Sequence, residues 1–196
     1  MKFITIMGSP KKNGKTAFTL SLFEDHMRKA GHEIERINAI DININNCQEC
    51  YACRRKSSEH GCPQKDDWDM LSKKLIAADG VIYATPLFCY GMSGQIKPIM
   101  DRHFSLMNKD LLKGKLSAEL VTCGGEEANN ADCIQTIFRR AFDINKGNKF
   151  KTTVVGTYVA ESSVKPDFEK RAEVVAEKMF NDFNCAIGRL WNLITQ

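Results

Sequence analysis

The sequence predicts an α/β protein in which an open, parallel, five-stranded sheet is covered by helices on both faces. Short and nearly continuous apolar runs recur along the chain, which is typical of strands buried on both sides. Between these runs, apolar residues return at intervals of three or four, which is typical of amphipathic helices. Because parallel strands need right-handed crossover connections, this alternation indicates three layers with the sheet in the middle.

The strands are expected where the apolar runs lie. The first covers residues 3–7, and Ile34 and Ile37 mark a weaker second strand. The remaining strands are expected at residues 81–84, 116–123 and 154–159. In such sheets, ligands bind beyond the carboxyl ends of the strands, where the strand order reverses. We therefore expect the functional loops to follow the first, third and fourth strands.

The first two helices follow from apolar spacing and from signals at their ends. Residues 20–30 carry one apolar stripe, and Gly31 follows as a C-terminal stop. The second helix has Trp68 and Leu71 on one side, and Asp66 is expected to be its N-cap.

Two more helices are expected in the second half of the chain. The third covers residues 95–107, with Pro98 in its first turn, where proline is tolerated. The last begins at Pro166 and has the longest stripe, formed by Phe168, Ala172, Val175, Met179, Phe183, Ile187 and Leu190. Cys133 and Cys185 fall on helical apolar patterns and are expected to be small core residues.

Length and composition indicate one globular domain. The 196 residues contain no repeat or linker, so a single domain over residues 1–196 is expected, with a cysteine-rich insertion at about 45–65. The 43% hydrophobic and 27% charged residues argue against a disordered or fibrous chain. The net charge of +4 is spread evenly, so no nucleic-acid partner is expected. With no apolar run of the ~20 residues that span a membrane and no secretory signal, we expect a cytoplasmic protein.

The loop after the first strand has the chemistry of a phosphate site. Residues 8–16 read Gly-Ser-Pro-Lys-Lys-Asn-Gly-Lys-Thr and lead into a helix. The backbone N–H groups of the helix start, the hydroxyls of Ser9 and Thr16, and the charge of Lys11 or Lys15 would meet there. The glycines are spaced wrongly for a Walker loop and for a dinucleotide fingerprint. A mononucleotide phosphate remains as the prediction.

The loops after the third and fourth strands suit a flat apolar ring. Residues 85–94 contain leucine, phenylalanine, tyrosine and methionine, whose exposure to water is costly unless they cover a ligand, a subunit or the core. Residues 122–127 contain Gly124 and Gly125, which let the backbone approach a ligand closely and present N–H donors. A phosphate at one loop and a ring at the other two together predict FMN.

Four cysteines crowd one short segment. Cys47, Cys50 and Cys53 are each separated by two residues, and Cys62 stands immediately before a proline. Thiolates spaced in this way can converge on one centre, as in proteins that hold cubane iron–sulfur clusters. In a reducing compartment, metal binding or redox chemistry is expected before disulfides. Zinc is the competing occupant, with His60 as an alternative ligand.

Taken together, these motifs resemble those of the NAD(P)H-dependent FMN reductase family of flavodoxin-like proteins, and within it the iron–sulfur flavoprotein branch. The resemblance rests on the phosphate loop, the four cysteines followed by Asp66 and Asp67, residues 85–97, and the pair Asp101 and Arg102. It extends to about position 160. It implies a flavodoxin-like, doubly wound sheet of strand order 2-1-3-4-5, bound FMN, and a homodimer or homotetramer.

The resemblance also implies which residues form the site. The phosphate would be held by Ser9, Lys11, Asn13, Gly14, Lys15 and Thr16, and the flavin would be bordered by Pro86, Leu87, Phe88, Cys89, Gly124 and Gly125. Relatives often place asparagine at the position of Lys15. Iron–sulfur flavoproteins also space their last two cysteines more closely. A [4Fe–4S] cluster, a zinc ion and an empty thiol loop therefore all stay open for Cys47, Cys50, Cys53 and Cys62.

The predicted function is that of an FMN-dependent oxidoreductase. No catalytic side chain is required, because the flavin carries the chemistry. Without a cluster, NAD(P)H would be the donor and a small molecule the acceptor; with a [4Fe–4S] cluster, a ferredoxin-like donor would supply single electrons. A phosphate-binding ATPase and a zinc-stabilised binding module are the rivals from other classes. Asp101 and Arg102 are expected in buried or intersubunit ion pairs, and His103 is expected to be structural unless it approaches the flavin or an interface.

Overall fold

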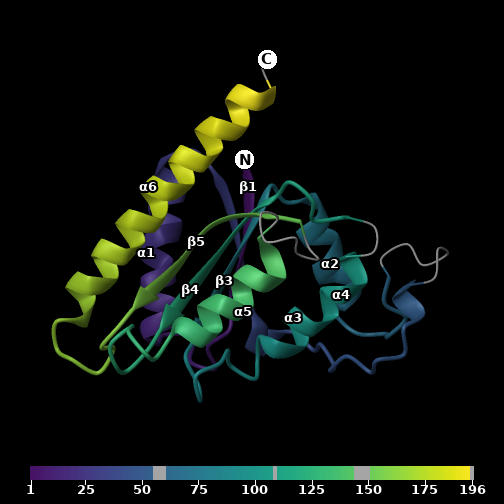
Figure 1. Ribbon diagram of the computed structural model, residues 1–196, viewed down its shortest axis with the longest axis horizontal. Helices are drawn as coiled ribbons and strands as arrows, with labels where there is room; N and C mark the ends of the chain where they lie inside the picture. The colour runs from purple at the N-terminus through teal and green to yellow at the C-terminus, as the bar shows by residue number, and fades with distance from the viewer. Residues whose placement is uncertain (55–60, 108–109, 144–150, 195–196) are drawn as a thin grey trace.

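A parallel five-stranded sheet forms the centre of the structure, a computed structural model that describes residues 1–54, 61–107, 110–143 and 151–194 (Figure 1). The strands stand in the order β2-β1-β3-β4-β5, and every neighbouring pair is parallel. Their bounds are Lys2–Met7 for β1, Glu33–Asn38 for β2, Gly80–Pro86 for β3, Leu116–Thr122 for β4 and Thr153–Ala160 for β5. The expected fold class and strand order are confirmed.

Helices cover both faces of this sheet. On one face lie α1 (Lys15–Lys29) and α6 (Phe168–Ile194), which pack against each other (Figure 1). On the other face lie α2 (Trp68–Ala77), α3 (Lys97–Arg102), α4 (Phe104–Met107) and α5 (Asp132–Phe142). The short 3₁₀ helices η1 (Ala39–Asp41) and η2 (Ala52–Arg54) lie in the segment after β2. Among the helices of the described ranges, none is both long and apolar enough to cross a membrane.

The β1 strand shows why its apolar run is continuous. Phe3 and Met7 pack into the core that α1 and α6 form, whereas Ile4 and Ile6 pack into the core on the side of α2 and α5. All four side chains are completely buried. Because successive side chains of a strand point to opposite faces, a strand covered on both sides needs an apolar residue at nearly every position.

The helix ends agree with the sequence signals at two places. Gly31 has a φ of +85°, its N–H donates to the carbonyl of Arg28 at 2.9 Å, and the next N–H, of His32, donates to Met27 at 3.1 Å. This left-handed residue stops α1 as expected. Pro98 lies in the first turn of α3, where its missing N–H costs no helical hydrogen bond.

Several local expectations were wrong. The helix expected over residues 95–107 is broken at His103, where the N–H of Leu106 donates to the His103 carbonyl, three residues back, at 2.8 Å. The last helix begins at Phe168, two residues after Pro166. The N-cap position of α2 is held by Asp67, without a side-chain cap, although Asp66 Oδ1 accepts a hydrogen bond from the Trp68 N–H at 3.1 Å.

The two cysteines expected in helical cores are also placed differently. Cys133 and Cys185 are exposed. In α5 the buried stripe runs through Ile134 and Phe138, and Cys133 stands one position off that stripe. In α6, Cys185 follows the buried Phe183 by two positions, which turns its side chain to the opposite side of the helix.

His103 lies in the core under the sheet. Its Nε2 is 2.7 Å from the hydroxyl of Tyr83, and its Nδ1 is 2.6 Å from the carbonyl of Ile99. Since a carbonyl only accepts, Nδ1 carries the proton and Nε2 accepts from Tyr83. Burial lowers the pKa of His103 to about 4, so the imidazole is neutral near pH 7. The side chain is structural, as the sequence indicated.

This buried imidazole predicts an acid sensitivity of folding. The unfolded chain takes up the His103 proton near pH 6.5, whereas the folded chain resists it until about pH 4. The free energy of unfolding therefore falls as the pH drops through this window, by about 3 kcal/mol from this residue. Urea unfolding of the native chain and of His103→Asn between pH 7 and 4 measures the difference. Equal pH slopes in both proteins would show that His103 is not the titrating group.

Candidate functional site

Hydrogen bonds tie the carboxyl ends of β1, β3 and β4 together at the edge where the predicted loops lie. The N–H of Gly8 donates to the carbonyl of Ala84 at 2.7 Å, and the N–H of Leu87 donates to Thr122 at 2.8 Å. The hydroxyls of Thr16 and Thr122 are 2.6 Å apart and buried. The three loops proposed from the sequence therefore share one rim of the sheet.

The loop at residues 8–16 is a tight turn into α1. Ser9 Oγ accepts from the Lys11 N–H at 3.1 Å, and the Gly14 N–H donates to the Lys11 carbonyl at 3.2 Å. A Cβ on Gly14 would lie 3.2 Å from the Cβ of Lys11, so a larger residue would disturb the turn. Gly14 caps α1 without a side-chain hydrogen bond, and the first turn holds no acidic residue. The positive end of the helix is thus left for an anion.

The lysines of this loop have different surroundings. Lys12 forms an ion pair with Asp41 at 2.5 Å. The ammonium of Lys15 lies 5.0 Å from the centre of the Phe168 ring. Lys11 is exposed and makes no ion pair with a residue that the structure describes. Of the three, only Lys12 is ion-paired with a residue that the structure describes, so the charges of Lys11 and Lys15 are both available to a bound anion.

The loop after β3 presents aromatic side chains on a strained turn. Phe88 and Gly91 exchange two backbone hydrogen bonds of 3.0 Å, and the residues between them, Cys89 and Tyr90, have φ angles of 47° and 61°. Two non-glycine residues in the left-handed region cost conformational energy, and such strain concentrates at functional loops. Phe88 is 49% and Tyr90 62% exposed. Apolar rings held out in this way suit a flat ligand or a neighbouring chain.

The glycine loop after β4 is held by the segment that follows β5. The carbonyls of Gly125 and Cys123 accept from the N–H groups of Ser162 and Ser163 at 2.7 and 2.8 Å. Burial, with a smaller effect of Glu161, raises the pKa of the Cys123 thiol, which keeps it neutral. Gly124 and Gly125 themselves are exposed, so a ligand could reach their backbone.

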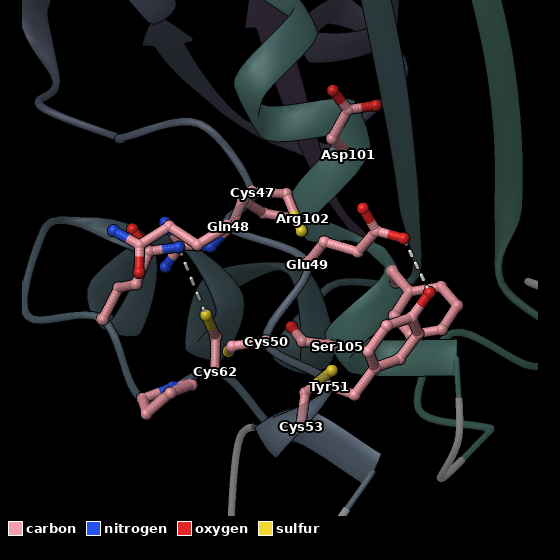
Figure 2. Close-up of a pocket in the computed structure, with 13 residues that line it drawn as sticks. Cys47, Gln48, Glu49, Cys50, Tyr51, Cys53, Cys62, Asp101, Arg102 and Ser105 are labelled. Atoms are coloured by element: carbon pink, nitrogen blue, oxygen red, sulfur yellow. Dashed lines mark hydrogen bonds between the residues drawn. The ribbon is translucent and has the colours of Figure 1, made fainter.

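A separate cavity of about 350 Å³ lies beside α3 and α4 and is lined by all four clustered cysteines (Figure 2). Cys53 and Cys62 are half-buried, whereas Cys47 and Cys50 are exposed. Burial raises the pKa of the Cys53 thiol, and the neighbouring thiols of Cys62, Cys47 and Cys50 raise it further. The four predicted ligands therefore line one cavity, which lies next to the C-terminal end of α3.

The described thiols are not arranged to coordinate a single metal ion. Among the described residues, no group of three or more His, Cys, Asp or Glu side chains is arranged to hold a metal ion. A tetrahedral zinc site needs each sulfur at about 2.3 Å from the ion. His60, the alternative zinc ligand, lies outside the described residues.

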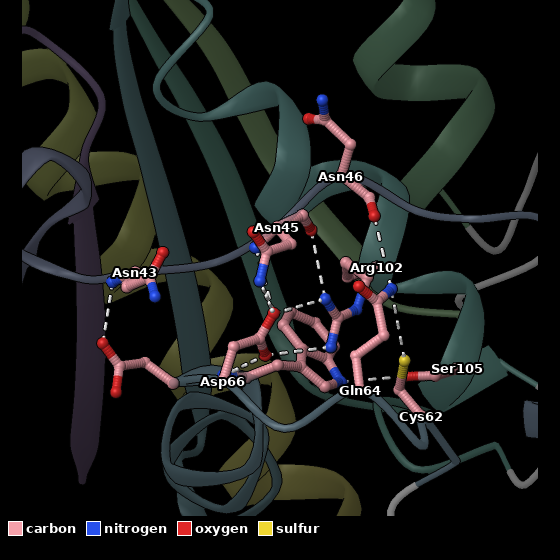
Figure 3. A network of polar contacts seen from close by, with 10 residues as sticks. Asn43, Asn45, Asn46, Cys62, Gln64, Asp66, Arg102 and Ser105 are labelled. Carbon is pink, nitrogen blue, oxygen red and sulfur yellow. Dashed lines mark hydrogen bonds and ion pairs between the residues drawn. The ribbon is translucent and has the colours of Figure 1, made fainter.

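Arg102, which lines the cysteine cavity, forms a buried ion pair with Asp66 (Figure 3). The guanidinium of Arg102 donates to both carboxylate oxygens of Asp66 at 2.9 and 3.1 Å, and both side chains are at most 1% exposed. This confirms a buried pair for Arg102. Asp101 instead forms an exposed pair with Lys97 at 2.6 Å. The amide of Gln64 donates to the Asn46 carbonyl at 3.2 Å and faces the sulfur of Cys62 at 4.0 Å.

Some of these positions were not found from the sequence. Ser93 is completely buried and joins the β3 loop to the phosphate loop through a hydrogen bond from its hydroxyl to the Gly8 carbonyl. Thr122 and Gln64 were missed as well. In the sequence, the only sign of a role for these residues was that they stand beside the motifs. Their hydrogen-bond partners are far away along the chain, so no local pattern links them.

The strand order and the loops at this rim define a flavodoxin-like protein. Residues 1–159 match the family described as NADPH-dependent FMN reductase, and the chain belongs to that family. The chain is also similar in structure to an NAD(P)H:quinone oxidoreductase from Methanothermobacter marburgensis, with a TM-score of 0.70 at 17% identity over 92% of this chain and 93% of the other.

Two relatives are named iron-sulfur flavoproteins. One, from Methanocaldococcus jannaschii, is 29% identical over 192 residues, which cover 93% of this chain and 95% of the relative. Another, from Archaeoglobus fulgidus, is 31% identical over 125 residues, which cover 64% of this chain. The match spans just over half of the Archaeoglobus protein, 56% of its length.

The buried hydroxyl pair at the rim predicts a measurable coupling. Thr16→Val or Thr122→Val alone leaves one buried hydroxyl without its partner and should lower the free energy of unfolding by about 1–2 kcal/mol. The double variant should lose less than the sum of the two, because no hydroxyl is then left unpaired. Urea unfolding of the four proteins measures this. Purely additive losses would mean that the hydrogen bond contributes nothing.

Proposed function

We propose that this chain binds FMN at the rim formed by β1, β3 and β4 and acts as an oxidoreductase, with NAD(P)H as donor and a small molecule as acceptor. The observation that carries this proposal is the set of hydrogen bonds that joins a phosphate-type loop to two ring-type loops. Family membership supports it independently. FMN would supply the chemistry, by taking up a hydride or single electrons at its ring.

The residues of the chain then have defined tasks. The backbone N–H groups at the start of α1, with the hydroxyl of Ser9 and the charge of Lys11, bind the phosphate. Phe88 and its neighbours cover the ring and exclude water from it. Backbone donors of Gly124 and Gly125 stabilise negative charge on the reduced ring. We propose further contacts in the same way. The phosphate is also contacted by Asn13, Gly14, Lys15 and Thr16, and the ring by Pro86, Leu87 and Cys89.

A second role is supported by the cysteine cavity. We propose that Cys47, Cys50, Cys53 and Cys62 hold a [4Fe–4S] cluster, which would supply one-electron transfer with a ferredoxin-like donor. The donor set fits, because four thiols line one cavity of about 350 Å³. The cysteine sulfurs around a cubane lie further apart than those around a single metal ion, so the absence of a single-ion site among the described residues does not conflict with this proposal. The names of the relatives agree with this assignment.

The setting of the protein is part of the same proposal. All eight cysteines are free, which fits a reducing compartment such as the cytoplasm. A homodimer or homotetramer would bury the exposed Phe88 and Tyr90 beside the flavin. We also propose that the entire chain works as one domain.

The phosphate assignment predicts selective loss of FMN affinity. Lys11→Gln removes an exposed cation of the loop that has no ion pair among the described residues. It should weaken FMN binding roughly tenfold while leaving the binding of riboflavin, which lacks the phosphate, unchanged. Lys12→Gln is the matched control, because that lysine is already paired with Asp41. Quenching of flavin fluorescence gives the affinities. If neither flavin binds to the native chain, or if magnesium-dependent ATP hydrolysis is found in a colourless preparation, the proposal is wrong.

The cluster assignment predicts a spectroscopic change. Anaerobically purified native chain should show a broad brown absorbance that dithionite bleaches, and Cys50→Ser should lose this absorbance while still binding FMN. Cys133→Ser is the control, since this thiol is exposed on α5, away from the cavity. Iron, sulfide and zinc analyses identify the occupant. Stoichiometric zinc without iron would contradict the cluster and leave the flavin site standing.

A further inference from the structure

Arg102 is held rigidly at the wall of the cysteine cavity. Its side chain is 1% exposed and donates to Asp66 and, at 3.1 Å, to the Asn45 carbonyl. The guanidinium also lies 5.5 Å from the centre of the Trp68 ring. A guanidinium fixed by three hydrogen bonds and an aromatic face has one orientation.

One donor of this guanidinium is left over. The Nε–H of Arg102 is buried and has no hydrogen-bond partner among the described residues. Such donors are rare in folded proteins, because the lost hydration is not replaced. In Figure 3, Asp66 and Asn45 lie on one side of the guanidinium, whereas Cys62 and Ser105 lie on the other. Arg102 lines the cysteine cavity, whereas Asp66 lines a neighbouring pocket that it shares with Cys62.

A second donor at the same wall is directed at sulfur. Gln64 Nε2 lies 4.0 Å from Cys62 Sγ while it donates to the Asn46 carbonyl, and Gln64 lines the cavity too. Arg102, with its spare N–H, and Gln64 thus line the same cavity as the four thiols, and the carboxylates of Glu49 and Asp101 line it as well. Thiolates and inorganic sulfide are acceptors for such donors.

We propose that Arg102 sets the reduction potential of an iron–sulfur centre in this cavity. The inference rests on the cluster proposed above. When the centre takes up one electron from its donor, its negative charge grows by one, and a fixed cation with a spare N–H stabilises that reduced state more than the oxidised one. Arg102 therefore raises the potential, and the Gln64 amide acts in the same direction.

The test compares the two halves of the ion pair in the full chain, with the cluster reconstituted anaerobically. Arg102→Gln removes the cation and should make reduction about tenfold less favourable, a midpoint shift of about 59 mV to more negative values for one electron. Asp66→Asn removes the counter-ion and should shift the midpoint the opposite way. Lys29→Gln, which removes an exposed cation at the end of α1 on the other face of the sheet, should leave it unchanged. Dithionite titration followed by absorbance gives the potentials, and the FMN potential in each protein is the internal reference.

The possible results separate the cluster proposal from the proposed role of Arg102. No brown chromophore in the native chain after reconstitution overturns the cluster and this inference with it, whereas flavin binding is judged separately. A cluster whose potential is equal in the native chain, Arg102→Gln and Asp66→Asn overturns this inference alone, because a merely structural ion pair would affect folding and not the potential. If Arg102→Gln does not fold, Asp66→Asn alone tests the ion pair, and it must shift the midpoint to more positive values. Gln64→Leu must then also shift the midpoint to more negative values.

Discussion

The parallel pairing of β1, β3 and β4 determines where the candidate site lies. Since the three strands run in the same direction, their carboxyl ends lie at one rim, and so do the loops that follow them. Hydrogen bonds such as the one between the hydroxyls of Thr16 and Thr122 then hold the loops in place relative to one another. The site is assembled from segments more than 100 residues apart, as the separation of 106 between these two threonines shows.

The segment after β3 links the two candidate redox sites. It leaves the strand at the rim, makes the strained turn at Cys89 and Tyr90, and is fastened to the phosphate loop by Ser93. It then enters α3, whose last residue, Arg102, lines the cysteine cavity. One stretch of about fifteen residues therefore contributes to both candidate sites. A change in the position of α3 would alter the geometry of each of them.

Much of the fold could be predicted from the sequence, because it depends on local patterns. The unbroken apolar run of β1 and the stop at Gly31 follow from pleating and from glycine's backbone freedom. The gathering of four cysteines was visible in their spacing. The features that were missed depend on partners far along the chain. Asp66 was expected to cap a helix because its pair, Arg102, is 36 residues away. The break at His103 follows a core contact with Tyr83 that no local pattern contains.

In the proposed complex, one FMN molecule contacts all three loops at once. The most direct measurement is an amide NMR titration of the isotope-labelled full chain with FMN. We expect saturation at one FMN per chain, with the largest shift changes at residues 8–16, 85–94 and 122–127 and small changes across β2 and the middle of α6. Absence of any change, or changes centred on a different part of the protein, would contradict it.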